Sequence, residues 1–187
     1  MRGDKVTNLF KWFDFLIIEE MVELGSKVLD IGCDDGSLLK MLQDKKKVDA
    51  RGIELYSDRV NLCLEKGLPV VQGDANFDLE MYPDNSFDYV ILSKTLQSVN
   101  KPREILQQLL RIGKKAIVSI PNFGHWKVRL YLTLNGQMPM TPSLPAKWYN
   151  TENIHLCTIN DFLSLCDEIN IEIIKSVALD KNGVQLN

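Results

Sequence analysis

A short apolar run that stops at a pair of glycines constrains the fold of this chain more than any other feature. Residues 27–31 carry the apolar side chains Val28, Leu29 and Ile31 of a short buried strand, and a loop with Gly32 and Gly36 follows. A turn of this kind joins a strand to the start of a helix, and a ligand can approach its backbone because glycine carries no side chain. The run therefore predicts the first strand of an α/β sheet, with a ligand loop at its carboxyl end.

Strand and helix patterns alternate along the chain from this point to residue 120. After an amphipathic helix over 9–23, the predicted strands are 27–31, 49–55, 69–72, 87–92 and 116–120, and the predicted helices are 37–42, 57–66 and 102–112. A sixth strand is predicted over 171–178. This alternation indicates an α/β fold with a doubly wound, mostly parallel sheet.

The alternation of strands and helices stops after the fifth strand. We interpret residues 121–157 as an insertion within one domain that spans 1–187. The segment is rich in proline and aromatic residues, namely Pro121, Pro139, Pro142, Pro145, Trp126, Tyr131, Trp148 and Tyr149. Long connections in compact domains tend to be lids or binding loops, and 123–134 has the apolar spacing of a helix. Thr158 with Asp161 three residues later predicts an N-capped helix that ends near residue 167.

Glycine spacing and acidic residues indicate which nucleotide the first loop binds. The dinucleotide fingerprint requires G-x-G-x-x-G after the strand, whereas Gly32 and Gly36 stand as G-x-x-x-G, which argues against a nicotinamide enzyme. A pyrophosphate disfavours nearby carboxylates, but a sulfonium with an ammonium group favours them. The acids Asp30, Asp34 and Asp35 therefore favour S-adenosylmethionine (SAM).

Acidic residues also end the next two predicted strands. Glu54 stands where doubly wound folds place the carboxylate that binds ribose hydroxyls, and Asp74 is a candidate acceptor for an adenine amino group. Either acid alone is more often a solvated loop residue. Acids at the ends of three successive strands, however, favour a single ligand crevice. The candidate cofactor residues are Asp30, Gly32, Cys33, Asp34, Gly36, Glu54, Leu55, Asp74, Ala75 and Ser93.

Composition excludes several other classes of function. A formal net charge of -3, with one basic run at Lys45–Lys47, provides no footprint for nucleic acid. The four cysteines lie far apart and lack zinc-ligand spacing, so we expect a reduced, cytoplasmic protein without a structural metal. Neither a secretory signal nor an apolar run of the roughly 20 residues that span a membrane is present.

Several longer motifs resemble those of a known family. The first set resembles class I SAM-dependent methyltransferases, and comprises Val28-Leu29-Asp30-Ile31-Gly32-Cys33, Gly52-Ile53-Glu54, Gln72-Gly73-Asp74 and Phe87-Asp88-Tyr89-Val90. The second set resembles the MetW family of methionine-biosynthesis proteins, and comprises Leu92-Ser93-Lys94-Thr95-Leu96-Gln97, Ile117 to Trp126 and Asn153 to Thr158. The resemblance covers nearly the whole chain. It implies a Rossmann-like class I methyltransferase fold, SAM as cofactor with S-adenosylhomocysteine as product, and a homoserine O-acyltransferase partner.

Two departures from the superfamily pattern stand out. Asp34 replaces a glycine of D-x-G-x-G-x-G, which introduces strain if the backbone needs a positive φ and adds a charge near the cofactor's carboxylate. The chain also ends at Asn187, soon after the predicted sixth strand, where the superfamily usually adds a seventh antiparallel strand.

Candidate residues for chemistry are few, because methyl transfer mainly needs proximity and orientation. The Asn-Pro-Pro-Tyr motif of nucleic-acid amino methyltransferases is replaced by Ser93-Lys94-Thr95-Leu96. His155 is either a general base or a histidine that braces the lid, and His125 is expected to pack. Cys33 and Cys157 are expected to be buried small hydrophobes. The candidate substrate and lid residues are Lys94, Asn122, Trp126 and Tyr149.

Two functions remain open from the sequence. One is a methyltransferase for a small-molecule acceptor, and the other is a non-catalytic SAM-binding subunit that regulates the acyltransferase through the insertion. Aromatic side chains of the insertion exposed together would favour a partner surface, whereas closure over a pocket would favour a lid.

Overall fold

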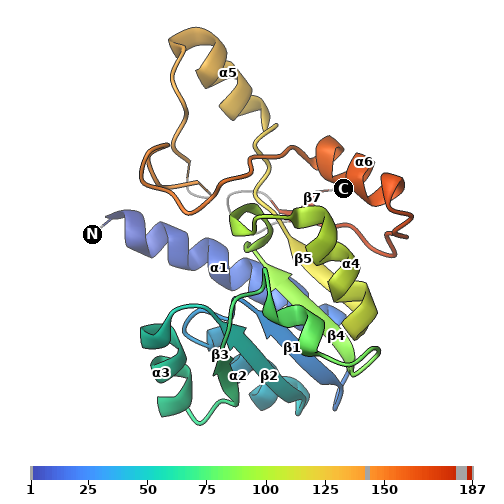
Figure 1. Cartoon of the computed structure of the whole chain (residues 1–187). Helices are drawn as coiled ribbons and strands as arrows, with labels where there is room; N and C mark the ends of the chain where they lie inside the picture. Colours follow the sequence, from blue (N-terminus) through green and yellow to red (C-terminus); the bar gives the residue numbers. More distant parts are fainter. Residues whose placement is uncertain (1, 142–143, 180–184, 187) are drawn as a thin grey trace. The chain divides into compact units, whose positions relative to one another are not determined.

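The computed structural model describes residues 2–141, 144–179 and 185–186. The chain divides into two compact units, Ile17–Ile120 and Met1–Leu16 with Pro121–Asn187 (Figure 1). A single domain over 1–187 stays a prediction. The 17–120 unit contains every strand of the main sheet.

The main sheet has five parallel strands in the order β3-β2-β1-β4-β5 (Figure 1). The strands are β1 (Lys27–Ile31), β2 (Asp49–Glu54), β3 (Val70–Gln72), β4 (Phe87–Ser93) and β5 (Gly113–Ser119). Asp30 of β1 lies opposite Gly52 of β2 and Ile91 of β4. The connections run to opposite sides of the β1–β4 pair, which makes its carboxyl end a topological switch point where such sheets bind ligands. The predicted doubly wound parallel sheet is confirmed.

The helices of the 17–120 unit follow the predicted alternation. They are α2 (Ser37–Lys46), α3 (Ser57–Glu65) and α4 (Pro102–Ile112). Proline opens α4 and Gly113 caps it, as the sequence predicts. Helices α2 and α3 contact the β2–β3 half of the sheet, and α4 contacts the β4–β5 half. Two short 3-10 helices, η1 (Asp78–Met81) and η2 (Leu96–Ser98), are absent from the sequence prediction.

A continuous apolar core supports this sheet. The largest fully buried side chains among the described residues all belong to the 17–120 unit, and are Leu29, Ile31, Leu38, Leu39, Leu42, Ile53, Leu68, Leu79, Ile91, Leu92, Leu109 and Ile112. Each such side chain contributes about 1.5–3 kcal/mol when it leaves water. The carboxyl ends of the strands are therefore held on a rigid platform.

The other unit contains helices but no strand of the main sheet, and the boundary between the units falls within its first helix. Helix α1 (Arg2–Met21) begins before the predicted 9–23, and α5 (Trp126–Asn135) and α6 (Ile159–Glu168) match predicted helices. The capping box of Thr158 and Asp161 at the start of α6 is confirmed.

The predicted sixth strand over 171–178 is wrong. Residues 171–177 have no strand structure, and β6 (Ala178–Leu179) pairs only with β7 (Gln185–Leu186), antiparallel and apart from the main sheet. The apolar alternation of this segment satisfies the local requirement for a strand. A strand also needs a neighbouring strand whose backbone groups can hydrogen-bond with its own. The local sequence does not determine whether such a neighbour is present.

Candidate cofactor site

The loop after β1 has a left-handed backbone at three alternate positions. Gly32, Asp34 and Gly36 have φ of 72°, 51° and 73°. Glycine adopts this conformation freely, whereas an L-residue loses roughly 1–2 kcal/mol. The strain predicted for Asp34 is therefore present.

Gly32 and Gly36 are needed because the loop packs closely against its neighbours, as well as for the approach of a ligand. A Cβ on Gly32 would lie 2.7 Å from the Thr95 Oγ1 and 2.9 Å from its Cγ2. A Cβ on Gly36 would overlap Leu68 and would lie 2.9 Å from the Cys63 Sγ. The loop is consequently wedged between the segment that follows β4 and helix α3.

The Glu54 carboxylate, at the carboxyl end of β2, holds this loop in place. Its Oε2 accepts a hydrogen bond from the Asp34 N–H at 2.9 Å, and its Oε1 accepts one from the Tyr56 N–H at 3.1 Å. The side chain is buried, as is Asp30 at the end of β1. Each carboxylate oxygen has a second acceptor position, so these bonds leave Glu54 the capacity to accept from a ribose.

Two basic residues of the α3 region neutralise loop acids, which sequence reasoning missed. The Arg59 guanidinium lies 3.1 Å from Asp34 Oδ1, and the Lys66 ammonium lies 3.0 Å from Asp35 Oδ2. Asp35 also accepts hydrogen bonds from the Ser37 N–H and hydroxyl at the start of α2. The loop is thus less negative than the sequence suggests. Arg59 and Lys66 stand two helical turns apart. This spacing was the sequence signal that could have identified the two residues as a pair.

The loop after β3 is built around Asp74. Its Oδ1 accepts hydrogen bonds from the Asn76 N–H and amide at 2.8 Å each, and its own N–H donates to Asp78 Oδ2 at 2.7 Å. Ala75 is half-buried and Leu55, after β2, is 47% exposed. Parallel strands end at one edge, so Asp30, Glu54 and Asp74 stand at the carboxyl ends of β1, β2 and β3 as predicted.

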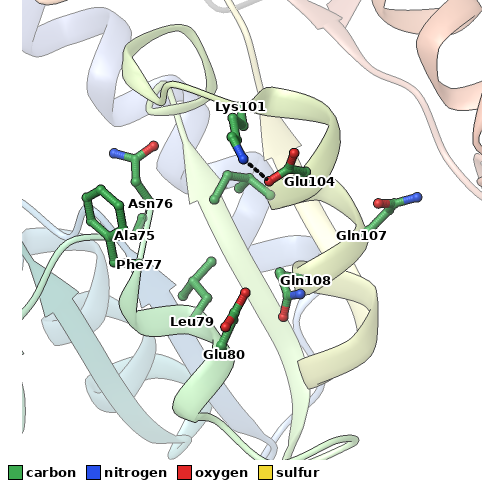
Figure 2. Close-up of a pocket in the computed structure, with 10 residues that line it drawn as sticks. Ala75, Asn76, Phe77, Leu79, Glu80, Lys101, Glu104, Gln107 and Gln108 are labelled. Atoms are coloured by element: carbon green, nitrogen blue, oxygen red, sulfur yellow. Dashed lines mark hydrogen bonds and ion pairs between the residues drawn. The ribbon is translucent and has the colours of Figure 1, made fainter.

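A small pocket lies beside this loop rather than at the switch point. Figure 2 shows its lining, which comes from the segment after β3 on one side and from α4 on the other. Its volume is ≈ 120 Å³, and the Lys101–Glu104 ion pair borders it. Of the candidate cofactor residues it includes only Ala75. It is therefore not the predicted crevice.

Polar groups gather where β4 and β5 end. Ser93 Oγ lies 3.3 Å from Ser119 Oγ, and the Lys94 N–H donates to the Ser119 backbone oxygen at 3.0 Å. Lys94 has a φ of 55°, so two adjacent central strands, β1 and β4, are each followed by a strained non-glycine residue. Such strain often marks functional sites.

Gln97, which sequence reasoning did not single out, is buried in η2 just after this cluster. Its Oε1 finds no hydrogen-bond partner among the described residues. A buried acceptor of this kind is unfavourable unless something satisfies it.

The predicted substrate and lid residues of the insertion lie in the other unit. Asn122 Oδ1 accepts from the Gly124 N–H at 2.9 Å, Trp126 and Tyr149 are 61% and 64% exposed, and His155 is exposed. Participation of these residues in one site with the β1 loop stays a prediction.

His125, which is expected to pack, is exposed and caps a helix instead. Its Nδ1 accepts from the Lys127 N–H at 3.3 Å and caps α5, and its ring lies 6.0 Å from that of Trp126. A capping and stacking role accounts for this histidine.

Three cysteines are buried, and Cys157, which is expected to be buried, is half-buried. Cys63 also donates a hydrogen bond to the Asp34 backbone oxygen at 3.2 Å. All four are free thiols, and burial raises the pKa of Cys33, Cys63 and Cys166, and also that of the half-buried Cys157. No group of metal-ligating side chains occurs in the part of the chain that the structure describes. In the same residues, no helix is long and apolar enough to cross a membrane.

Known proteins have similar sequences. The family model described as "Methionine biosynthesis protein MetW" matches residues 12–186. The "Bifunctional methionine biosynthesis protein MetXA/MetW" of Rhodopirellula baltica is 34% identical over 172 residues, which cover 87% of this chain and 28% of that relative. The chain spans 28% and 60% of the length of the first curated relatives that it matches.

Solved structures share the fold. A SAM-dependent methyltransferase of Thermotoga maritima, described as a possible histamine N-methyltransferase, has a TM-score of 0.63 at 20% identity over 89% of this chain and 73% of its own. The Haemonchus contortus phosphoethanolamine N-methyltransferase 2, in complex with S-adenosyl-L-methionine, has a TM-score of 0.60 at 15% identity over 84% of this chain and 36% of its own. The predicted Rossmann-like methyltransferase fold is confirmed.

Proposed function

Because the chain belongs to the MetW family of methionine biosynthesis proteins, we propose that it binds SAM at the β1 loop and supports a homoserine O-acyltransferase as a partner subunit. The observation that carries the partner role is the R. baltica relative, whose name joins MetXA and MetW in one bifunctional chain. Its free thiols suit the reducing cytoplasm, where we propose that it acts.

The chemistry of the strand ends fits SAM. The loop residues Asp30, Gly32, Cys33, Asp34 and Gly36 would hold the amino-acid part, with the buried Asp30 carboxylate suited to an ammonium group. Glu54 and Leu55 would hold the ribose, Asp74 and Ala75 the adenine, and Ser93 would line the crevice.

The Arg59–Asp34 pair removes the main objection to SAM at this loop. An aspartate in place of glycine adds a negative charge where the cofactor brings its own carboxylate. The guanidinium 3.1 Å away offsets that charge. This pair supports the proposal that the loop accepts the cofactor despite the substitution.

Methyl transfer to a small molecule is the second candidate function. The strained Lys94 and the buried Gln97 oxygen support it, because both follow the central strand β4. When bound, SAM would supply an electrophilic methyl group. Lys94 would then be the candidate of the 17–120 unit for orienting an acceptor. In the other unit, Asn122, Trp126 and Tyr149 are the candidates for acceptor contacts, and His155 is the candidate base.

Ligand-dependent thermal unfolding tests the cofactor assignment. SAM and S-adenosylhomocysteine should each raise the melting temperature, because ligand at 100 times Kd stabilises by about 2.7 kcal/mol, and NAD should leave it unchanged. Absence of a shift with both SAM species would refute the site.

Acyltransferase assays with and without this chain test the partner role. Homoserine O-acyltransferase activity should change when the purified chain is added at a matched concentration. Unchanged activity, together with methylation of a small molecule from labelled SAM, would favour the second function instead.

A further inference from the structure

Helix α5 of the insertion leaves most of its apolar side chains uncovered. Helices on globular proteins usually bury an apolar stripe, yet α5 buries Val128 alone. We define the insertion surface as the exposed apolar and aromatic side chains of 121–151, represented by Trp126, Leu130, Tyr131, Leu134, Trp148 and Tyr149. Exposure of these aromatic side chains favours a partner surface, because large apolar groups left in water often mark interaction sites.

Neighbouring side chains hold the aromatic rings of this surface. The Lys127 ammonium lies 5.4 Å from the Trp126 ring centre, and the Lys147 ammonium lies 5.6 Å from that of Tyr149. The Trp148 and Tyr149 rings meet edge to face with centres 5.5 Å apart. Held rings lose less side-chain entropy when a partner covers them, which favours binding.

The charge of this segment is opposite to that of the whole chain. The insertion 121–157 contains one acidic residue, Glu152, against three basic ones, Lys127, Arg129 and Lys147, in a chain of net charge -3. Basic groups around exposed aromatic rings match an apolar patch bordered by carboxylates.

A second copy of this chain is a poor occupant of the same surface. In a two-fold interface each patch meets itself, so these three cations would face each other with Glu152 as the one carboxylate of 121–157 to offset them. This charge balance favours a different protein as the source of the complementary surface.

We propose that the insertion surface is where the homoserine O-acyltransferase docks, through an apolar face bordered by acidic side chains. This assignment rests on the proposed partner role. It adds where the partner binds and which chemistry recognises it. Aromatic anchors provide the affinity, and Lys127, Arg129 and Lys147 provide orientation and salt dependence.

A matched pair of charge reversals tests the docking surface. The test variant is K127E/R129E/K147E, and the control is K40E/R51E/K101E, which removes the same charge from exposed positions of the 17–120 unit. Titration calorimetry with the purified acyltransferase should show affinity at least about tenfold weaker for the test variant than for the control. Raising the salt concentration should weaken wild-type binding and affect the test variant less.

An aromatic variant tests the anchors independently. W126A/Y149A should weaken binding by about tenfold or more, whereas L24A/M81A, at two apolar positions that are each 74% exposed, should bind as wild type does. Unchanged melting temperatures of all four variants establish that they fold.

The outcomes separate the two proposals. Failure of the wild-type chain to bind the acyltransferase overturns the partner role and the docking surface together. Wild-type binding that both test variants retain overturns only the docking surface. The surface assignment also fails if K127E/R129E/K147E loses only self-association in sedimentation, or only binding to phosphatidylglycerol vesicles.

Discussion

The two units of this chain differ in how far they bury their apolar residues. In the 17–120 unit they fill the core between sheet and helices, and side chains such as Leu29 and Ile91 are fully buried. In the other unit, Trp126, Leu134 and Trp148 are between 61% and 73% exposed. The 17–120 unit also exposes apolar side chains, such as Leu24 and Met81 at 74% each, but it holds all of the largest fully buried side chains among the described residues. Function follows the same division, because a rigid sheet edge suits a cofactor and an uncovered apolar surface suits a partner.

The largest expected contrast comes from truncating a leucine in each unit. Leu29→Ala should lower the free energy of unfolding by about 2–5 kcal/mol, because it leaves a cavity in the sheet core. Leu134→Ala, at a position that is 73% exposed, should change it by less than about 0.5 kcal/mol. Urea unfolding followed by circular dichroism measures both. Equal losses would show that α5 is covered in the folded protein.

Gly67, in the same unit, provides a matched control for Gly32 of the cofactor loop. Gly32 and Gly67 both have φ of 72°, but a Cβ at Gly67 would meet nothing within 4 Å. Both alanine variants should lose roughly 1–2 kcal/mol for the left-handed backbone. Gly32→Ala should lose more, because the new Cβ meets Thr95, and it should also weaken SAM binding. Equal unfolding midpoints for the two variants would contradict the wedged loop.

In the unit with little core, local hydrogen bonds should matter more. Thr158→Ala should lower stability by about 1 kcal/mol through loss of the α6 cap, and Thr133→Ala, in α5, provides the comparison. Hydrogen bonds from the Thr158 backbone and side chain lower the pKa of Asp161.

The pH dependence of this cap follows from the lowered pKa. The stabilisation is present above the ordinary pKa of an aspartate and is lost as the pH falls through the lowered value, so the Thr158→Ala effect should shrink in acid. NMR titration of Asp161 should show a higher pKa in Thr158→Ala. An unchanged Asp161 pKa would exclude the hydroxyl as a donor.

The smallest expected effect concerns the exposed Arg59–Asp34 pair. Arg59→Gln should weaken SAM binding because it leaves the Asp34 charge uncompensated, and Asp34→Gly should strengthen it by removing both charge and strain. Coupling in the double variant should be about 0.2–1 kcal/mol, as for other exposed pairs.

The control for this pair is Arg51→Gln, which breaks the Arg51–Asp49 pair at the start of β2. It should leave SAM affinity unchanged. Strictly additive effects of Arg59→Gln and Asp34→Gly would show that the guanidinium does not offset the loop charge.

Features that depend on residues close together in the sequence were predicted correctly, whereas features that depend on distant residues were not. Strand Lys27–Ile31 and helix Pro102–Ile112 were predicted to the residue, because an apolar run, a glycine turn and an N-terminal proline act within a few positions. The strand predicted over 171–178 failed because pairing depends on a distant edge. Arg59 was missed for the same reason, since its partner Asp34 lies on another element.

The sequence by itself determined the α/β alternation, the order of glycines and acids along the β1 loop, and the family to which the chain belongs. These properties follow from local residue patterns and from sequence motifs. Only the tertiary structure decided that Glu54 holds the loop backbone, that Arg59 and Lys66 neutralise its acids, and that the aromatic residues of the insertion are uncovered. Each of these depends on which distant groups meet and which stay in water, and folding settles both through packing.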